Sequence, residues 1–121
     1  MPRAGRERHR WMQDFVERYA VTLLLKGART VIGERGEATV FNTTGHPGMA
    51  SGGMGDVLTG VAAALIAQGK GLREAAMLGA WVCGRAAEIA VTRGASQESL
   101  CASDVMANLG RAFASLRRGE Y

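Results

Sequence analysis

Residues 42–60 of the chain read NTTGHPGMASGGMGDVLTG. A glycine-dense loop leads here directly into an apolar helical pattern. Glycines let the backbone approach a ligand closely, and the unpaired amides at the start of a helix attract phosphate oxygens. Asp56 is unexpected at such a site, because its carboxylate would repel an anion unless it removes a proton, holds a metal or caps the helix. The stretch therefore predicts a phosphate-binding loop with a candidate base beside it.

The residues upstream of this loop follow the order expected of an α/β fold. An amphipathic helix over residues 7–19 precedes the apolar run 21–25, which we expect to be a strand buried on both faces of a parallel sheet. Two further strands are expected at residues 30–32 and 38–41. The polar turn 33–36 between them predicts that these two strands pair antiparallel as a hairpin.

Three more helices are expected downstream of the loop. The first covers residues 57–68, ends at Gly69, and is apolar nearly all round, so it should be buried. The second covers residues 72–92 and stops at Gly94. The third starts after Ser103, a candidate N-cap, and its expected buried stripe is Val105, Met106, Leu109, Phe113 and Leu116. The whole predicts an α/β fold with a buried strand, a β-hairpin and about four helices.

Composition and charge narrow the function classes. The chain has 121 residues, 47% of them hydrophobic, and a net charge of +4. Its arginines gather at the two ends, but no aromatic residues interleave with them, so we expect a solvated surface rather than a nucleic-acid interface. No segment is long and apolar enough to cross a membrane. The two cysteines lack CxxC spacing, which argues against a zinc site and favours a reducing, cytoplasmic setting.

The loop does not match the two common nucleotide motifs. No Lys-Ser or Lys-Thr pair follows its glycines, so it is not a Walker A motif. Leu58 stands where a dinucleotide fingerprint needs its third small residue. The remaining interpretation is a phosphate site at Gly52–Asp56.

Residues 44–60, together with the segment LKGART at 25–30, resemble the ADP-dependent or ATP-dependent NAD(P)H-hydrate dehydratase family, a branch of the ribokinase-like superfamily. The likeness runs more loosely to residue 105. It implies a ribokinase-like three-layer fold. The family domain is much longer, so residues 1–121 are expected to be a single partial domain, its C-terminal portion.

The resemblance implies a role for each residue that matches the family motifs. Lys26, Gly27, Ala28, Arg29 and Thr30 match the nucleotide-binding KGxxT segment, and Gly55 matches a nucleotide-contacting glycine. The backbone of Gly52, Gly53, Met54 and Gly55 would form the anion hole. Asp56 matches the acid that contacts the hydrated dinucleotide and acts as the base. His46 stands where asparagine is usual and Met54 where serine or threonine is common, but neither change removes a backbone donor.

The same resemblance implies the reaction and the partners. The family dehydrates hydrated NADH or NADPH and uses ADP or ATP as co-substrate, with Mg²⁺ bridging the nucleotide phosphates and no metal ligands from this chain. Expected partners are an NAD(P)H-hydrate epimerase, a separate N-terminal half, or further copies of the chain, because a sheet of one strand and a hairpin would expose apolar edges.

Three alternatives stay open from the sequence. The chain could be an inactive nucleotide-binding remnant, or a small-molecule kinase of the same superfamily, since a Gly-Gly-x-Gly-Asp loop serves both chemistries. Asp56 could also be only a first-turn acid favoured by the helix dipole.

Overall fold

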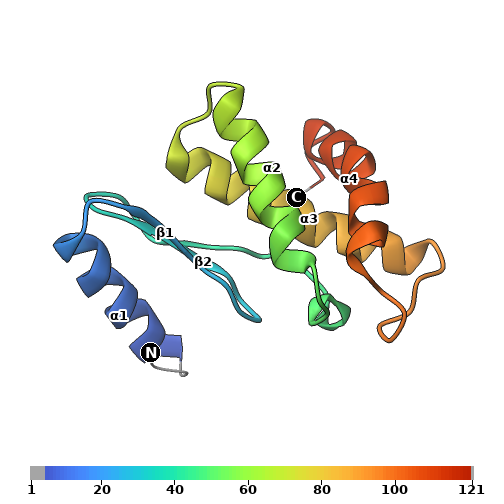
Figure 1. Ribbon diagram of the computed structural model, residues 1–121, viewed down its shortest axis with the longest axis horizontal. Helices are drawn as coiled ribbons and strands as arrows, with labels where there is room; N and C mark the ends of the chain where they lie inside the picture. Colours follow the sequence, from blue (N-terminus) through green and yellow to red (C-terminus); the bar gives the residue numbers. More distant parts are fainter. Residues whose placement is uncertain (1–4, 121) are drawn as a thin grey trace.

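The computed structural model describes residues 5–120, which form three layers (Figure 1). Helix α1 lies on one side of a small sheet, and helices α2, α3 and α4 lie on the other. The elements are α1 (Gly5–Arg18), β1 (Thr22–Leu25), β2 (Val31–Glu34), β3 (Val40–Phe41), the short 3-10 helix η1 (Pro47–Met49), α2 (Met54–Ala67), α3 (Leu72–Thr92) and α4 (Ala102–Arg117). The expected α/β class and the helix count are confirmed for the described part of the chain.

The sheet is antiparallel throughout, with the strand order β1-β2-β3. Leu24 pairs with Ile32, and Ile32 pairs in turn with Val40. The expected hairpin is confirmed, but the parallel setting expected for residues 21–25 is wrong. The connection between β1 and β2 is only residues 26–30, whereas a parallel neighbour needs a crossover of about a dozen residues or more. Of the four residues of β1, only Leu25 is fully buried.

Strand β2 joins the layers because its successive side chains point to opposite faces of the sheet. Ile32 is fully buried and packs with Ala76 and Ala80 of α3. On the other face, Gly33 lies under Met12 of α1, so that a Cβ atom on Gly33 would be 2.7 Å from the terminal methyl carbon of Met12. The missing side chain at Gly33 therefore lets α1 approach the sheet closely.

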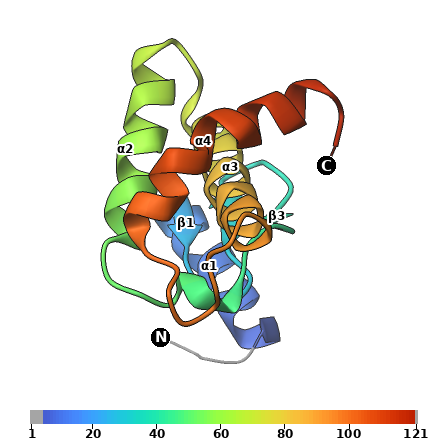
Figure 2. The same ribbon diagram turned by 90° about the vertical axis from the view of Figure 1, so that its right-hand side faces the viewer.

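The larger core lies among α2, α3 and α4, which pack against one another (Figure 2). Its centre is the small-residue face of α3, where Val82, Cys83, Ala86 and Ala87 are almost completely buried. Burial raises the pKa of the Cys83 thiol to about 11, so this thiol stays protonated and behaves as an apolar side chain. The prediction that α3 covers residues 72–92 is confirmed, and Gly94 follows it with a φ of 113°.

Helix α2 differs from its sequence prediction in its start and its burial. It begins at Met54 rather than Val57, and only Met54 and Leu65 are fully buried, while Ile66 is 42% exposed. The expectation of an all-round buried helix is therefore wrong. The outer face of α2 is made largely of glycine and alanine, which count as apolar in the sequence but bury little area. Among the helices of residues 5–120, none has the length and apolar character needed to cross a bilayer.

Helix α4 begins one residue before Ser103. Its N-cap is Cys101, so the prediction of Ser103 as the cap is wrong. Within the predicted stripe, Val105 is 1% exposed, but Met106 is 59% exposed. The buried positions are Val105, Asn108, Ala112 and Ser115, whose spacing follows the side of α4 that faces α3.

The loop between β3 and α2 is attached to α3 by hydrogen bonds. The Thr44 hydroxyl donates to the carbonyl of Trp81 at 2.9 Å, and the Asn42 amide donates to the carbonyl of Ala80 at 3.2 Å. Gly84 makes room for this contact, because its Cβ atom would be 2.8 Å from the carbonyl carbon of Thr44. The path of the loop toward α2 is thus fixed on the surface of α3.

Gly84→Ala should destabilise the fold by about 1–3 kcal/mol, because the new methyl group would overlap the backbone of Thr44. Gly60→Ala is the matched control, since a Cβ atom there meets nothing within 4 Å. Replacing glycine by alanine within a helix should raise the free energy of unfolding by about 0.5–1 kcal/mol. Urea denaturation measures both changes. A Gly84→Ala protein as stable as Gly60→Ala would refute the tight contact.

Candidate functional site

The predicted phosphate-binding loop ends at an open helix N-terminus. Gly53 is the N-cap of α2 and has a φ of 89°, a left-handed conformation that favours glycine. The amides of the first helical turn have no acceptor within the helix, so they are free to bind an anion. Gly52 is exposed, and a Cβ atom on it would meet nothing within 4 Å. The side chain of Met54 is buried in the core among α2, α3 and α4 and so attaches the end of the loop to that core.

Lys26 reaches the first turn of α2. A Cβ atom on Gly55 would lie 2.5 Å from Nζ of Lys26 and 3.8 Å from its Cε. The fold therefore brings together two segments that are separate in the sequence, the turn after β1 and the loop before α2. An ammonium group beside unpaired helix amides gives a strongly anion-attracting environment. Gly55 is needed here because any side chain would displace this amino group.

Asp56 is exposed and does not cap its helix. It occupies the third position of α2, but its carboxylate accepts no hydrogen bond from the backbone N–H of the N-cap Gly53. Within residues 5–120, the Asp56 carboxylate has no hydrogen-bond or ion-pair partner. Its carboxylate is thus available to a ligand, and the capping explanation for this acid does not hold.

Asp104 shows what a capping acid at the same helical position looks like in this chain. It is the third residue of α4, and its Oδ2 accepts the backbone N–H of Cys101 at 2.9 Å and the Cys101 thiol at 3.2 Å. These hydrogen bonds, the backbone one first, hold the pKa of Asp104 below its ordinary value. The two acids occupy the third position of their helices, but only Asp104 caps its helix.

The remaining predicted nucleotide residues lie in the turn between β1 and β2. Gly27, Ala28 and Arg29 are exposed, and no hydrogen bond of the described residues links Ala28 or Arg29 to the α2 loop. The carbonyl of Thr30 accepts the backbone N–H of Asn42 at 2.8 Å and so fastens the start of β2 to the end of β3. Of the segment 26–30, Lys26 is the residue that the structure brings to the loop.

The side chain of His46 accepts a backbone hydrogen bond in the loop before α2. Its Nδ1 atom accepts the N–H of Gly48 at 3.0 Å, which shapes the short helix η1. An asparagine oxygen could accept the same N–H, so the exchange preserves the local turn. Gly48 itself lies against the chain at Gln97, whose carbonyl oxygen would be 2.7 Å from a Cβ atom.

Sequence reasoning missed the segment that borders the loop at the start of α4. The Ser51 hydroxyl donates to the carbonyl of Leu100 at 3.3 Å, and a Cβ atom on Gly53 would be 3.2 Å from that of Ala102. The looser likeness around residues 102–105 was the signal that could have identified this segment. Its backbone forms one wall of the loop.

The described residues offer no cage for a metal ion. Groups of three or more His, Cys, Asp or Glu side chains that could hold one are absent from residues 5–120. A cation at this loop would therefore need ligands from a bound phosphate, with Asp56 as the nearby carboxylate.

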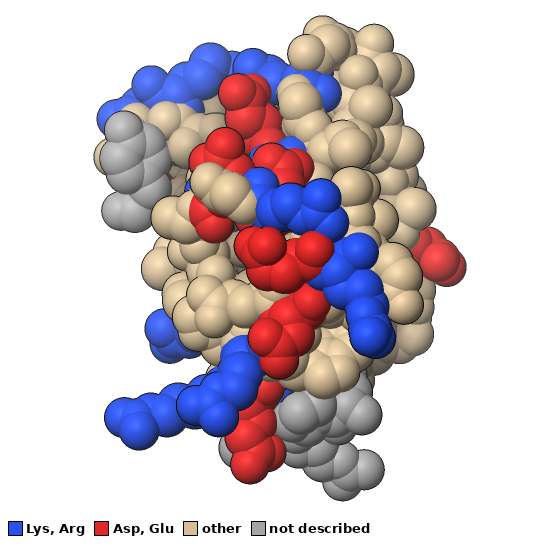
Figure 3. All heavy atoms as spheres, turned by 90° about the vertical axis from the view of Figure 1, so that its left-hand side faces the viewer, with Lys and Arg blue, Asp and Glu red and all other residues tan. Residues whose placement is uncertain are grey.

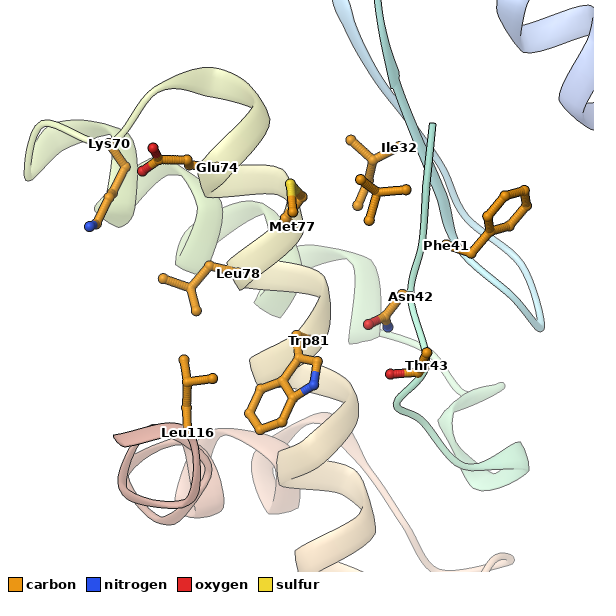
Figure 4. A pocket seen from close by; sticks show the side chains of 11 residues that line it. Ile32, Phe41, Asn42, Thr43, Lys70, Glu74, Met77, Leu78, Trp81 and Leu116 are labelled. Atoms are coloured by element: carbon orange, nitrogen blue, oxygen red, sulfur yellow. The ribbon is translucent and has the colours of Figure 1, made fainter. Parts of the chain in front are cut away.

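A separate cavity of about 320 Å³ lies between β3, α3 and α4 (Figure 4). Leu78, Trp81 and Leu116 give it an apolar wall, while Lys70 and Glu74 lie at one end. None of the predicted site residues lines this cavity. Its apolar walls suit a phosphate group poorly, so the cavity and the loop are distinct features.

The face of the molecule that carries α1 mixes both signs of charge (Figure 3). Basic side chains there are interspersed with acidic ones, which is typical of a solvated surface.

Comparisons with known proteins agree on the family. The family model described as NAD(P)H-hydrate dehydratase matches residues 2–108. The bifunctional NAD(P)H-hydrate repair enzyme Nnr of Vibrio cholerae is 44% identical over 98 residues, which are 81% of this chain and 19% of that protein. The ADP-dependent (S)-NAD(P)H-hydrate dehydratase of Neisseria meningitidis is 39% identical over 71 residues, which are 59% of this chain and 24% of that protein.

A solved structure supports the same assignment. The ADP/ATP-dependent NAD(P)H-hydrate dehydratase of Bacillus subtilis, co-crystallised with ATP and Mg²⁺, superimposes with a TM-score of 0.82 at 26% identity. The match covers 90% of this chain and 39% of that one. The fold is therefore that of a carbohydrate-kinase-like α/β protein. Within that class, the chain belongs to the NAD(P)H-hydrate dehydratase family.

Asp104→Ala should lower the melting temperature more than Asp56→Ala, because only Asp104 forms capping hydrogen bonds. Since the pKa of Asp104 is lowered in the folded state, its contribution is full at neutral pH and is lost as the pH falls through that lowered pKa. Thermal unfolding of both variants between neutral and acidic pH tests this difference. Equal losses at neutral pH would contradict it.

Proposed function

We propose that this chain supplies the phosphate-binding loop and the catalytic base of an ADP-dependent or ATP-dependent NAD(P)H-hydrate dehydratase. The observation that carries the proposal is the arrangement at the start of α2. The Lys26 ammonium lies at Gly55, next to helix amides that have no acceptor within the helix, and Asp56 in the same turn does not cap the helix. The substrates would be hydrated NADH or NADPH and an adenine nucleotide. The names of the relatives and the ATP/Mg²⁺ in the solved dehydratase support both.

In this proposal the nucleotide phosphates bind where the positive charges converge. The Lys26 ammonium and the amides of Gly53, Met54 and Gly55 would hold the phosphate oxygens and stabilise charge as it moves during transfer. The open space at Gly52 lets a phosphate approach the backbone. Mg²⁺, when bound, would neutralise part of the phosphate charge, held by the phosphates because residues 5–120 form no cage for it.

Asp56 would act on the hydroxyl group of the hydrated ring. Its carboxylate accepts the hydroxyl proton while the hydroxyl oxygen bonds to the terminal phosphorus, and the bond from that phosphorus to the rest of the nucleotide breaks. The new phosphate ester is a good leaving group. The lone pair of the ring nitrogen expels it as phosphate, and loss of a proton from the neighbouring ring carbon restores the dihydronicotinamide.

The chain spans 19% of the Vibrio cholerae relative and 39% of the Bacillus subtilis dehydratase. We therefore infer that turnover takes place in a larger assembly, in which further protein completes the substrate site. Another half of the domain, an epimerase and further copies of the chain are the partners that we propose, in the cytoplasm.

Asp56→Asn should reduce the dehydration rate by about 10²- to 10⁴-fold, because the amide cannot accept the hydroxyl proton. The Kd for ADP should stay unchanged, since the binding groups are untouched. The assay mixes the chain with the complementary N-terminal part of the Vibrio cholerae relative and follows NADH absorbance and free phosphate.

Asp14→Asn is the control, because Asp14 is an exposed acid on α1. Full activity in Asp56→Asn would refute the base assignment. Nucleotide consumption with a lasting phosphorylated product would instead indicate a kinase, and ADP binding without turnover in the mixture would indicate a binding remnant.

Gly55→Ala should weaken ADP binding by about tenfold, the loss expected when a charge-assisted hydrogen bond is removed. The new Cβ atom would push the Lys26 ammonium away from the loop, while the flexible lysine spares the fold. Gly60→Ala, five residues further along α2, should leave the Kd unchanged. Calorimetric titration of both variants decides the matter, and an unchanged Kd in Gly55→Ala would contradict a Lys26 contact with the nucleotide.

A further inference from the structure

Arg8 on α1 reaches the chain just after β1. Its Nη2 atom donates to the carbonyl oxygen of Lys26 at 2.8 Å and to that of Leu25 at 3.4 Å. These carbonyls belong to the last residue of β1 and the first residue of the turn that follows it. One guanidinium therefore fixes the orientation of the peptide that carries the Lys26 side chain.

The same guanidinium explains the glycine at position 27. A Cβ atom on Gly27 would lie 2.9 Å from Nη1 of Arg8 and 3.0 Å from its Nη2. Gly27 is not among the glycines with positive φ, so other residues could adopt its backbone conformation. The missing side chain at Gly27 leaves space that Arg8 occupies, and a Cβ atom there would push the guanidinium away.

Arg8 is itself held in place by the packing of α1. Arg8, Met12 and Val16 follow one another at intervals of four residues and so lie on one face of the helix. Met12 is completely buried over Gly33, and Val16 is 4% exposed. His9, next to Arg8, forms a further hydrogen bond of 2.9 Å to the hydroxyl of Thr39. The guanidinium thus extends from a fixed helix rather than from a free end.

The contact continues to the phosphate-binding loop through Lys26. Arg8 donates to the carbonyl of Lys26, and the Nζ atom of Lys26 lies at Gly55. We propose that Arg8 is a positioning residue for the nucleotide site, which directs the Lys26 ammonium onto the first turn of α2 without touching the nucleotide. This inference rests on the proposed function for the nucleotide, but the ordering of the Lys26–Gly27 turn by Arg8 can be tested without any nucleotide.

A double-mutant cycle on the full chain tests the path from Arg8 through Lys26. Arg8→Ala and Lys26→Ala should each raise the Kd for ADP by about tenfold, and the double variant should raise it no further. Two effects that multiply would mean that Arg8 contacts the nucleotide directly or acts by another route, and would overturn the proposal.

Two further variants separate positioning from general destabilisation. Arg10→Ala, on the exposed side of α1, should leave the Kd unchanged. Arg8→Lys should recover part of the affinity, since an ammonium can still donate to the Lys26 carbonyl. A melting temperature lowered equally in Arg8→Ala and Arg8→Lys, with equal loss of affinity, would favour a merely structural role and contradict the proposal.

Backbone ¹⁵N relaxation without nucleotide keeps the two proposals apart. The order parameter of the Gly27 amide should fall in Arg8→Ala and stay unchanged in Arg10→Ala. If the chain binds no ADP but this difference appears, the nucleotide site fails while the ordering role of Arg8 stands. If ADP binds and the order parameter of Gly27 is unaltered, the role of Arg8 fails while the proposed function stands.

Discussion

Long side chains lie close against glycines at three points that link α1, the sheet and α2. Met12 packs over Gly33, Arg8 lies against Gly27, and Lys26 lies over Gly55. The first contact sets α1 on the sheet, the second fixes the turn after β1, and the third connects that turn to α2. A side chain at any of these glycines would overlap its neighbour, so this series of contacts depends on the absence of Cβ atoms.

The elements with strong local signals were predictable from the sequence. Residues 72–92 form α3 as expected, because small residues and the closing Gly94 mark both its face and its end. The hairpin was predictable from its polar turn. Neither the direction of β1 nor its burial on both faces was predicted correctly, because an apolar run shows hydrophobicity but not which strands or helices will cover it. The short link 26–30 is what makes the pairing antiparallel.

Burial and capping were harder to predict than the elements themselves. The alanines of α2 suggested a buried helix, but tertiary packing leaves much of this helix exposed. The sequence did not indicate Cys101 as the cap of α4, because cysteine is an uncommon N-cap residue. In the candidate site, the motif indicated Gly55 and Asp56, but the contact of Lys26 with Gly55 and the position of Arg8 are long-range features that a local pattern does not contain.

Asp56 and Asp104 show how the surroundings decide the use of an acid. Both occupy the third position of a helix, where the helix dipole favours a negative charge. The Asp104 carboxylate accepts the backbone N–H of the N-cap Cys101, whereas the Asp56 carboxylate accepts no such bond from the N-cap Gly53. A carboxylate that caps nothing within its own helix stays open to a polar ligand, and the base role that we propose for Asp56 needs such a carboxylate.

The central claim is that Lys26 and the first turn of α2 form one phosphate site. Amide NMR spectra of the ¹⁵N-labelled chain, recorded as ADP and Mg²⁺ are added, test it most directly. If Lys26 and this turn do form one site, the largest shifts should occur together at Lys26, Gly27 and residues 52–56. Shifts confined to the apolar cavity around Met77 and Trp81, with none at the loop, would contradict it.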